Sequence, residues 1–364
     1  MDENIPIPAG LSLEDFLITR LAGRAIKNQD VLQADALFVR SVTKVNAQLL
    51  QGSKVSFVAS ATAGIDHLDQ EYLKSAGIHY AYAPGSNAPS VVDYVLACLA
   101  AIDRDPREAR VGIVGCGQVG GRLYKRLKAL GAQSCCYDPF LSHAEQENLV
   151  SFEKVLASDI LCLHTPLTES GAYPTKAMIG RQQLMALPEN AVLINAGRGG
   201  VVVEKDLKEL INTRPDLQLI VDVWENEPNI DTDLADSCAI ATPHIAGYAA
   251  KSKIRGSQMI FEALFRHFDR AIPDITEEQS VMGLRTEEAL SNWQAAVLKV
   301  YEPRLDDARL KELISECKVS ALPFGEAFDL ARKNYPKRKE LGEFCSESAA
   351  LQAFGFSPPS KNFS

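Results

Sequence analysis

The stretch that decides the fold is Val111-Gly112-Ile113-Val114-Gly115-Cys116-Gly117-Gln118-Val119-Gly120. It predicts a buried strand that breaks into a Gly-x-Gly-x-x-Gly turn, and leucines at helical spacing follow in residues 123–130. Gly115 permits the tight turn, Gly117 lets a pyrophosphate approach the backbone, and Gly120 lets the helix pack closely on the strand. The start of that helix offers free N–H groups and the positive end of its dipole to the phosphates. The stretch therefore predicts a dinucleotide site.

A second predicted strand, residues 132–137, ends in Asp138. An acid in this place accepts hydrogen bonds from both hydroxyls of an adenosine ribose, and its charge repels a 2′-phosphate. We therefore expect NAD rather than NADP. The alternative interpretation is a glycine turn in an ordinary α/β unit, but strand, helix, second strand and terminal acid all fall in register.

Composition narrows the class of protein. The chain has 364 residues, 46% of them hydrophobic and 23% charged, which is typical of a globular protein with two or three compact units. The formal net charge of -9 disfavours a broad nucleic-acid or acidic-membrane surface, so an anionic substrate would need a local basic pocket. The apolar run at residues 95–102 is too short to span a bilayer, and no basic-then-apolar leader opens the chain.

The cysteines predict no metal site. None of the eight forms a Cys-x-x-Cys pair, and none stands at metal-ligand spacing with a histidine. Cys135 and Cys136 are adjacent on a strand and face opposite sides, so they should not pair. We expect reduced cysteines in a cytoplasmic protein.

Strands and helices alternate along the chain, which predicts parallel sheets of α/β class. Three strands are expected before the glycine turn and four more after the second strand of the dinucleotide unit: residues 36–40, 55–59, 79–82, 159–163, 191–195, 217–221 and 239–241. Helices at 90–102 and 254–268 should connect two domains. We expect a substrate domain (1–89 with 251–272), a Rossmann-type doubly wound domain (90–250) and a third domain at 273–364.

Three ionisable residues follow predicted strands at one sheet edge: Arg198, Glu227 and His244. Hydride transfer to a nicotinamide from a hydroxyl carbon needs an acid/base for the hydroxyl proton and a fixed cation for the anionic end of the substrate. Histidine suits the first role, especially beside a carboxylate, and the planar arginine fork suits the second. The alternatives are a structural histidine after Thr-Pro and a solvated loop arginine.

Four segments resemble the D-isomer-specific 2-hydroxyacid dehydrogenases, and the similarity extends over residues 30–270. They are residues 164–168 (HTPLT), 195–199 (NAGRG), 222–228 (DVWENEP) and 243–247 (PHIAG). The resemblance implies that Arg198, Glu227 and His244 are the catalytic set. The alternative class is an NAD-sensing binding protein on the same scaffold.

Within the family, residues 39–46, 61–64 and 244–248 are similar to members that oxidise 4-phospho-D-erythronate on the route to pyridoxal 5′-phosphate. The resemblance implies a small phosphorylated 2-hydroxy acid as substrate, contacted by Ser41, Thr62 and Tyr248. It assigns NAD to Gly115, Gly117, Gln118, Val119, Gly120, Asp138, Thr165, Ala196, Gly197, Arg198, Asp222 and Gly247. Ser41 and Thr62 could instead be helix caps, Asp222 a strand-end acid and Tyr248 a packing residue. A related dehydrogenase, acting on phosphoglycerate or on glyoxylate and hydroxypyruvate, is the other enzyme alternative.

The resemblance further implies a C-terminal α+β dimerisation domain, a homodimer, and a flavodoxin-like substrate domain. The substrate domain is expected to lack two strands of the family, one before Asp2 and one after Gly23, so we expect a reduced sheet with unpaired edges. A substrate phosphate needs cations beyond Arg198. Arg40 and Lys44 could supply some, and Arg338 and Lys339, in a basic segment at 328–341, are expected to reach the partner's site; the alternative for that segment is a solvated helix end.

Overall fold

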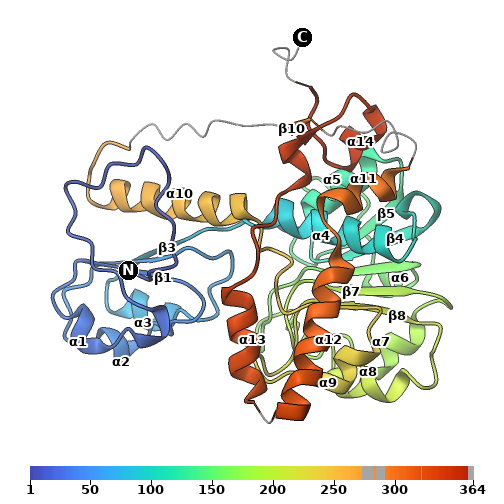
Figure 1. The fold of residues 1–364 in the computed structure, drawn as a ribbon, viewed down its shortest axis with the longest axis horizontal. Coiled ribbons are helices and arrows are strands. Elements are labelled where there is room, and N and C mark those ends of the chain that lie inside the picture. The colour runs from blue at the N-terminus through green and yellow to red at the C-terminus, as the bar shows by residue number, and fades with distance from the viewer. Residues whose placement is uncertain (273–281, 284–291, 321, 360–364) are drawn as a thin grey trace. The chain divides into compact units, whose positions relative to one another are not determined.

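The computed structural model describes residues 1–272, 292–320 and 322–359, together with the backbone of 282–283. Two compact units are formed by Met1–Asn87 with Ala249–Gln279, and by Ala88–Tyr248 with Ser280–Ser364 (Figure 1). The described residues of the C-terminal segment, for which we expected a third domain, thus group with the dinucleotide unit.

The first unit is built on a parallel sheet with the strand order β1-β2-β3, formed by β1 (Ala36–Val39), β2 (Phe57–Ser60) and β3 (His79–Tyr82). One face packs against helices α1 (Asn28–Val31), α2 (Ala47–Leu50) and α3 (Gln70–Ser75), and the other against α10 (Ala250–His267). Ile260 and Phe261 of α10 are buried against Phe38 and Phe57 of the sheet. Helix α10, which follows the last strand of the second unit, therefore completes the core of the first unit.

The N-terminal residues cover part of the sheet edge that we expected to be open. The backbone N–H of Asp2 donates to the carbonyl of Phe38 on β1 at 2.9 Å, and Asp2 also forms an isolated parallel bridge with Leu21. Ile5 is fully buried in the core beneath α10. The described sheet is small, as expected, but its β1 edge is not bare.

The second unit contains a parallel sheet with the strand order β5-β4-β6-β7-β8-β9. Its strands are β4 (Arg110–Val114), β5 (Gln133–Tyr137), β6 (Ile160–Leu163), β7 (Val192–Asn195), β8 (Gln218–Val221) and β9 (Ile240–Ala241). Strand β4 lies between β5 and β6, so the strand order reverses at β4: the chain adds β5 on one side of it and then β6 on the other. Ligands of doubly wound sheets bind at such a reversal, beyond the carboxyl ends of the strands. The Rossmann-type fold is confirmed.

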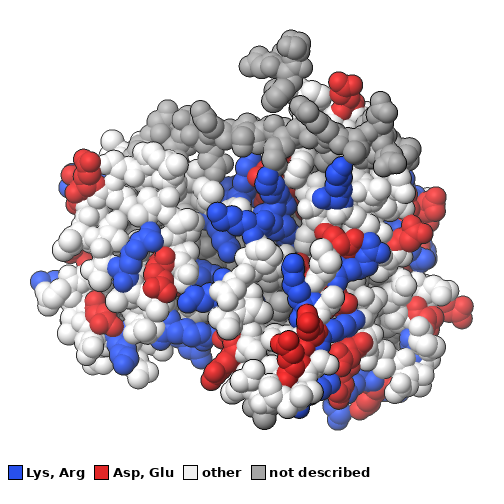
Figure 2. Space-filling model, viewed as in Figure 1, with Lys and Arg blue, Asp and Glu red and all other residues white. Residues whose placement is uncertain are grey.

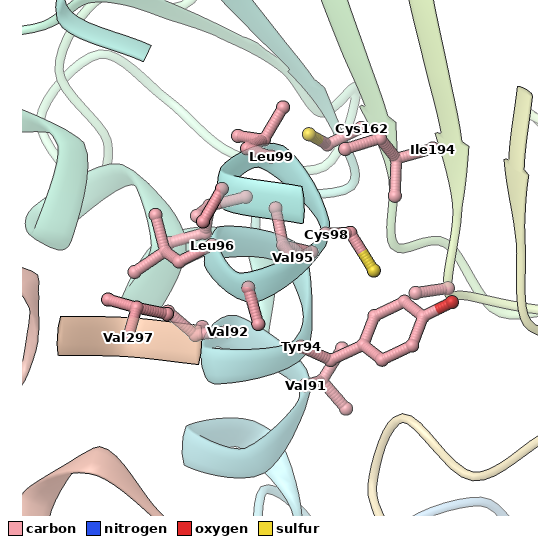
Figure 3. Close-up of a cluster of buried hydrophobic side chains, with 14 of the residues drawn as sticks. Val91, Val92, Tyr94, Val95, Leu96, Cys98, Leu99, Cys162, Ile194 and Val297 are labelled. Carbon is pink, nitrogen blue, oxygen red and sulfur yellow. The ribbon is translucent and has the colours of Figure 1, made fainter. Parts of the chain in front are cut away.

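Helices cover both faces of this sheet. One face packs on α4 (Ala88–Ala101), α5 (Gly120–Ala129), α11 (Trp293–Val300) and α14 (Ala349–Phe354). The other packs on α6 (Phe152–Leu156), α7 (Arg181–Ala186), α8 (Glu204–Leu210), α9 (Thr232–Ser237), α12 (Pro303–Ser320) and α13 (Phe324–Lys333). Helix α4 is buried along almost its whole length, which explains why most of its residues are apolar. Its Leu99 lies toward Cys162 of β6, and its Leu96 lies beside Val297 of α11 (Figure 3).

The C-terminal segment is thus part of the second core. Trp293 of α11 stacks on Phe354 of α14 with ring centroids 4.4 Å apart. A short parallel pair, β10 (Met282–Gly283) with β11 (Phe344–Cys345), and the 3-10 turn Leu341–Glu343 complete the described part. Two further 3-10 turns, Gly23–Ala25 and Pro106–Glu108, lie in the first and second units respectively.

Arg338 corrects our expectation for the basic segment. Its side chain is only 6% exposed and donates to the carbonyls of Ser90 and Ala246 in its own unit, with the guanidinium 4.3 Å from the ring centroid of Tyr301. A buried cation with partners in its own chain cannot reach across to a second subunit. Sequence could not show this, because the burial depends on contacts more than 90 residues apart in the chain.

Charged side chains of both signs are interspersed over the visible surface (Figure 2). Among the described helices, none combines the length and the apolar character needed to cross a membrane.

Candidate active site

The three glycines of the turn differ in their surroundings: Gly115 and Gly120 are packed against other protein atoms, whereas Gly117 faces open space. Gly115 has a φ of +88°, which side-chain-bearing residues rarely adopt. A Cβ at Gly120 would lie 1.9 Å from the Gly115 carbonyl oxygen, so helix α5 packs directly on the turn. A Cβ at Gly117 would meet nothing within 4 Å. The fold therefore needs glycine at 115 and 120, whereas at 117 the space is free for a ligand. Gln118, which is exposed, and Val119, the N-cap of α5, lead into the helix.

Asp138 lies at the end of β5 and anchors the glycine turn. Its Oδ2 accepts the backbone N–H of Cys116 at 2.9 Å, and its Oδ1 accepts that of Phe140 at 3.1 Å. It lines a cavity of about 350 Å³ together with Gly115, Thr165 and the exposed rings of Phe140 and Tyr173. These two rings pack edge to face, with their centroids 5.5 Å apart. Neither aromatic residue was singled out from sequence, because they come together only in the fold.

The segment after β6 holds buried polar atoms that lack partners. Within the described residues, Thr165 Oγ1 and both ring nitrogens of His164 have no hydrogen-bond partner. Burial lowers the pKa of His164 to about 4, so its ring is neutral at physiological pH. The backbone at Gly197 is packed tightly beside them, since a Cβ there would lie 3.0 Å from the Leu163 carbonyl oxygen; Ala196 is also buried. The unpartnered Thr165 hydroxyl and the open space at Gly117 fit a bound dinucleotide.

Asp222 follows β8 and organises the loop that carries the histidine. Its Oδ1 accepts the Thr242 hydroxyl and the backbone N–H of Ile245, both at 2.7 Å, and its Oδ2 accepts the N–H of Ala246 at 3.0 Å. Burial raises the pKa of Asp222, and the charge of His244 and these hydrogen bonds oppose that rise. Asp222 is therefore a buried carboxylate whose hydrogen bonds hold the loop that includes Gly247, rather than a solvated acid at a strand end.

Glu227 and His244 are in direct contact. His244 Nδ1 lies 2.8 Å from Glu227 Oε2, and Glu227 Oε1 accepts the backbone N–H of Trp224 at 2.9 Å. Burial works to raise the pKa of Glu227, but the His244 charge, their hydrogen bond, Arg332 and the Trp224 N–H lower it overall. The carboxylate therefore stays ionised and fixes the ring, which leaves Nε2 for proton transfer.

Arg198 lies in the loop after β7, the strand next to β8. Its backbone carbonyl accepts the Asn195 side-chain amide at 3.2 Å, and its own Nη1 donates to the Gly197 carbonyl at 2.9 Å. The carboxyl ends of β7, β8 and β9 are adjacent, so Arg198, the Glu227–His244 pair and Asp222 all follow one edge of the sheet.

The three residues expected to contact substrate divide between the units. Ser41 is exposed in the turn after β1, and Thr62 donates its hydroxyl to the Gly64 carbonyl at 2.8 Å, both in the first unit. Neither caps a helix: α2 is capped by Asn46. Tyr248, in the second unit, is half-buried, and its hydroxyl accepts Arg332 Nη2 at 3.1 Å.

Sequence reasoning missed two cations. Arg332 of α13 contacts Tyr248 and lies near the Glu227–His244 pair, whose electrostatics it affects. Lys253 of α10 has its pKa lowered by burial and, secondarily, by Arg40 at the end of β1. The basic composition of residues 328–341 drew attention to the region of Arg332, but helix periodicity cannot say which cation faces a site.

Comparison with known proteins defines the class. Residues 100–246 match the family described as D-isomer specific 2-hydroxyacid dehydrogenase, NAD binding domain. The NAD⁺-bound 3-phosphoglycerate dehydrogenase of Entamoeba histolytica is 25% identical with a TM-score of 0.58, over 67% of this chain and 83% of that one. The D-lactate dehydrogenase of Aquifex aeolicus, 24% identical with a TM-score of 0.60 over 71% and 91% of the two chains, has the same fold. Fold and site together define an NAD-dependent D-2-hydroxyacid dehydrogenase.

Relatives over nearly the full length narrow the assignment. The chain is 44% identical to erythronate-4-phosphate dehydrogenase of Cellvibrio japonicus (strain Ueda107) over 350 residues, which cover 94% of this chain and 93% of the relative. It belongs to the erythronate-4-phosphate dehydrogenase family.

Proposed function

We propose that the protein oxidises the C2 hydroxyl of 4-phospho-D-erythronate with NAD, giving 2-oxo-3-hydroxy-4-phosphobutanoate and NADH on the route to pyridoxal 5′-phosphate. The observation that carries this proposal is the 2.8 Å contact between Glu227 and His244, next to an arginine loop and a dinucleotide turn on one sheet edge. The full-length relatives bear the corresponding name.

The proposed roles follow from the geometry. His244 Nε2 takes the hydroxyl proton, because Nδ1 is held by Glu227. Glu227 stabilises the imidazolium that forms, and its anchor on the Trp224 N–H prevents the carboxylate from turning away. Arg198 orients the carboxylate and the C2 oxygen of the substrate. When bound, NAD accepts the hydride from C2.

We propose that Asp138 receives the adenosine ribose, while the Gly115–Gly120 turn and the start of α5 receive the pyrophosphate. The 350 Å³ cavity beside Asp138 supports this arrangement. Ser41, Thr62 and Tyr248 are proposed substrate contacts. Arg40 and Lys44 remain first-unit candidates for the phosphate, and Lys253, whose pKa is lowered by burial and by Arg40, adds a third cation to that candidate region.

Turnover tests the proposed function. With NAD, the protein should oxidise 4-phosphoerythronate with a far higher kcat/KM than 3-phosphoglycerate. His244→Gln should retain NAD binding while kcat falls on the order of 10²–10⁴-fold, the usual effect of losing general acid–base catalysis. Preference for 3-phosphoglycerate would contradict the proposal and favour a related dehydrogenase. No turnover of either acid, despite tight NAD binding, would favour an NAD-sensing binding protein.

We further propose a homodimer in the cytoplasm. Large apolar side chains are exposed in the C-terminal segment: Leu305 (56%), Val319 (90%), Leu322 (58%) and Leu330 (55%). Exposed apolar groups of this kind are suited to a subunit interface. The eight cysteines are free thiols, which suits a reducing compartment. Sedimentation equilibrium should give twice the 39.7 kDa chain mass, and Val319→Glu should shift the protein toward the monomer.

A further inference from the structure

Arg332 is an incompletely satisfied cation beside the proposed active site. Its side chain is 15% exposed, and its guanidinium lies over the rings of Tyr248 and Phe328, at 5.6 and 6.0 Å from their centroids. It donates from Nη2 to the Tyr248 hydroxyl, whereas its buried Nε has no acceptor among the residues that the structure describes. A guanidinium has five N–H donors, and a buried donor without an acceptor costs free energy.

The carboxylates around Arg332 do not supply the missing acceptor. Asp329, one turn earlier on α13, approaches Nη1 only to 4.0 Å. Glu227 and Asp222 are close enough to raise the pKa of Arg332 against the opposing effect of burial. Their oxygens, however, are engaged by His244, Trp224 and the loop that carries the histidine. Arg332 is therefore held charged while part of its hydrogen-bonding capacity is unused.

We propose that Arg332 binds the terminal phosphate of the substrate, in the subunit to which it belongs. This inference rests on the proposed function, in which Arg198 takes the carboxylate, so a second oxyanion needs a second cation. A phosphate offers three acceptor oxygens and close to two negative charges, which match a planar fork. The Tyr248 hydroxyl accepts from Arg332 at 3.1 Å, so the guanidinium lies beside a proposed substrate contact.

Arg332 belongs to the C-terminal segment rather than to the NAD-binding domain. The residue comes from α13, outside residues 100–246 that match the NAD-binding domain. Selection of a phosphorylated acid would thus depend on the C-terminal segment acting within its own subunit. This differs from supply by Arg338, whose side chain is committed to the carbonyls of Ser90 and Ala246.

The test compares Arg332→Met with Lys333→Met. Methionine keeps much of the packing between the two rings, and Lys333 is the adjacent, exposed cation at the end of the same helix. Steady-state kinetics would use 4-phosphoerythronate and unphosphorylated D-erythronate, each with NAD. Arg332→Met should lower kcat/KM for the phosphorylated acid about 10- to 100-fold, as expected for lost charge-assisted hydrogen bonds, mainly through KM. The kcat/KM for D-erythronate should fall much less, because that acid lacks the bound group, so the ratio of the two kcat/KM values is the readout of the phosphate contact. Lys333→Met should change neither.

Equal losses on both acids, or no loss on either, would overturn the phosphate role. Arg332→Lys covers the case in which methionine perturbs folding: it keeps the charge but not the fork, so KM should rise only for the phosphorylated acid. A rise on both acids would again overturn the role. The proposed function fails separately, since then the unmodified protein would not oxidise 4-phosphoerythronate at all.

Discussion

Replacing Glu227 by Gln tests the proton-transfer pair most directly. Glu227 Oε1 is fixed by the Trp224 N–H at 2.9 Å, and the glutamine oxygen can keep that bond. The amide NH₂ then occupies the place of Oε2, 2.8 Å from His244 Nδ1. A donor there favours the ring tautomer with its hydrogen on Nε2, which cannot accept the proton from the substrate hydroxyl.

The expected loss has two parts. The charge-assisted hydrogen bond to the imidazolium contributes about 1.5–3 kcal/mol, which is about 10- to 150-fold in rate. The unfavourable tautomer adds to this, so kcat should fall on the order of 10²–10⁴-fold in total. Because the carboxylate no longer favours the imidazolium, the acidic limb of the kcat/KM profile should move to lower pH by about one to two units.

The assay is NADH formation from 4-phosphoerythronate across the pH range, with NAD affinity measured by fluorescence titration. Glu225→Gln is the matched control: it makes the same change two residues earlier, where the side chain accepts the N–H of Glu204 instead of meeting the histidine. That variant should keep normal kcat. If Glu227→Gln retains kcat within about threefold and leaves the pH profile in place, the carboxylate serves packing and the catalytic reasoning is refuted.

Four further substitutions test the cofactor site and the second core. Asp138→Ala should weaken NAD binding by about 1.5–3 kcal/mol and narrow the preference for NAD over NADP; an unchanged NAD/NADP ratio of kcat/KM would contradict the ribose assignment. Gly117→Ala should leave thermal stability almost unchanged but weaken NAD binding, because its Cβ meets no protein atom, whereas Gly120→Ala should destabilise the fold. If Gly117→Ala binds NAD normally, the open space is not the pyrophosphate site. Burial raises the pKa of Asp93 to about 7, against the opposing N–H of Leu341. The unfolded carboxyl titrates near pH ~3.9. Between about pH 4 and 7 the folded state therefore binds more protons, and stability falls as pH rises. Asp93→Asn should flatten this fall by about 1–4 kcal/mol in urea titrations, and an equally steep fall would show that other groups cause it.

The sequence by itself determined the second unit to a large extent. The strand–glycine–helix pattern at 111–130 is local: it depends on turn geometry, on helical spacing and on buried strands that are apolar on both faces. The bounds of β4, β5 and α5 therefore follow from neighbouring residues. The order of elements also placed Arg198, Glu227 and His244 after adjacent parallel strands, because the carboxyl ends of such strands share one edge.

Tertiary structure decided how the C-terminal segment is used. Arg332 meets Tyr248 across 84 positions of sequence, and Arg338 meets Ala246 across 92. Both arginines stand in the same basic run, and nothing in local spacing distinguishes the one beside the site from the one buried in the core. The distinction arises from packing of α12 and α13 on the sheet, which buries one guanidinium under α4 and sets the other against Tyr248. Side-chain environment at such distances is a property of the whole fold, whereas the dinucleotide turn is specified within twenty residues of chain.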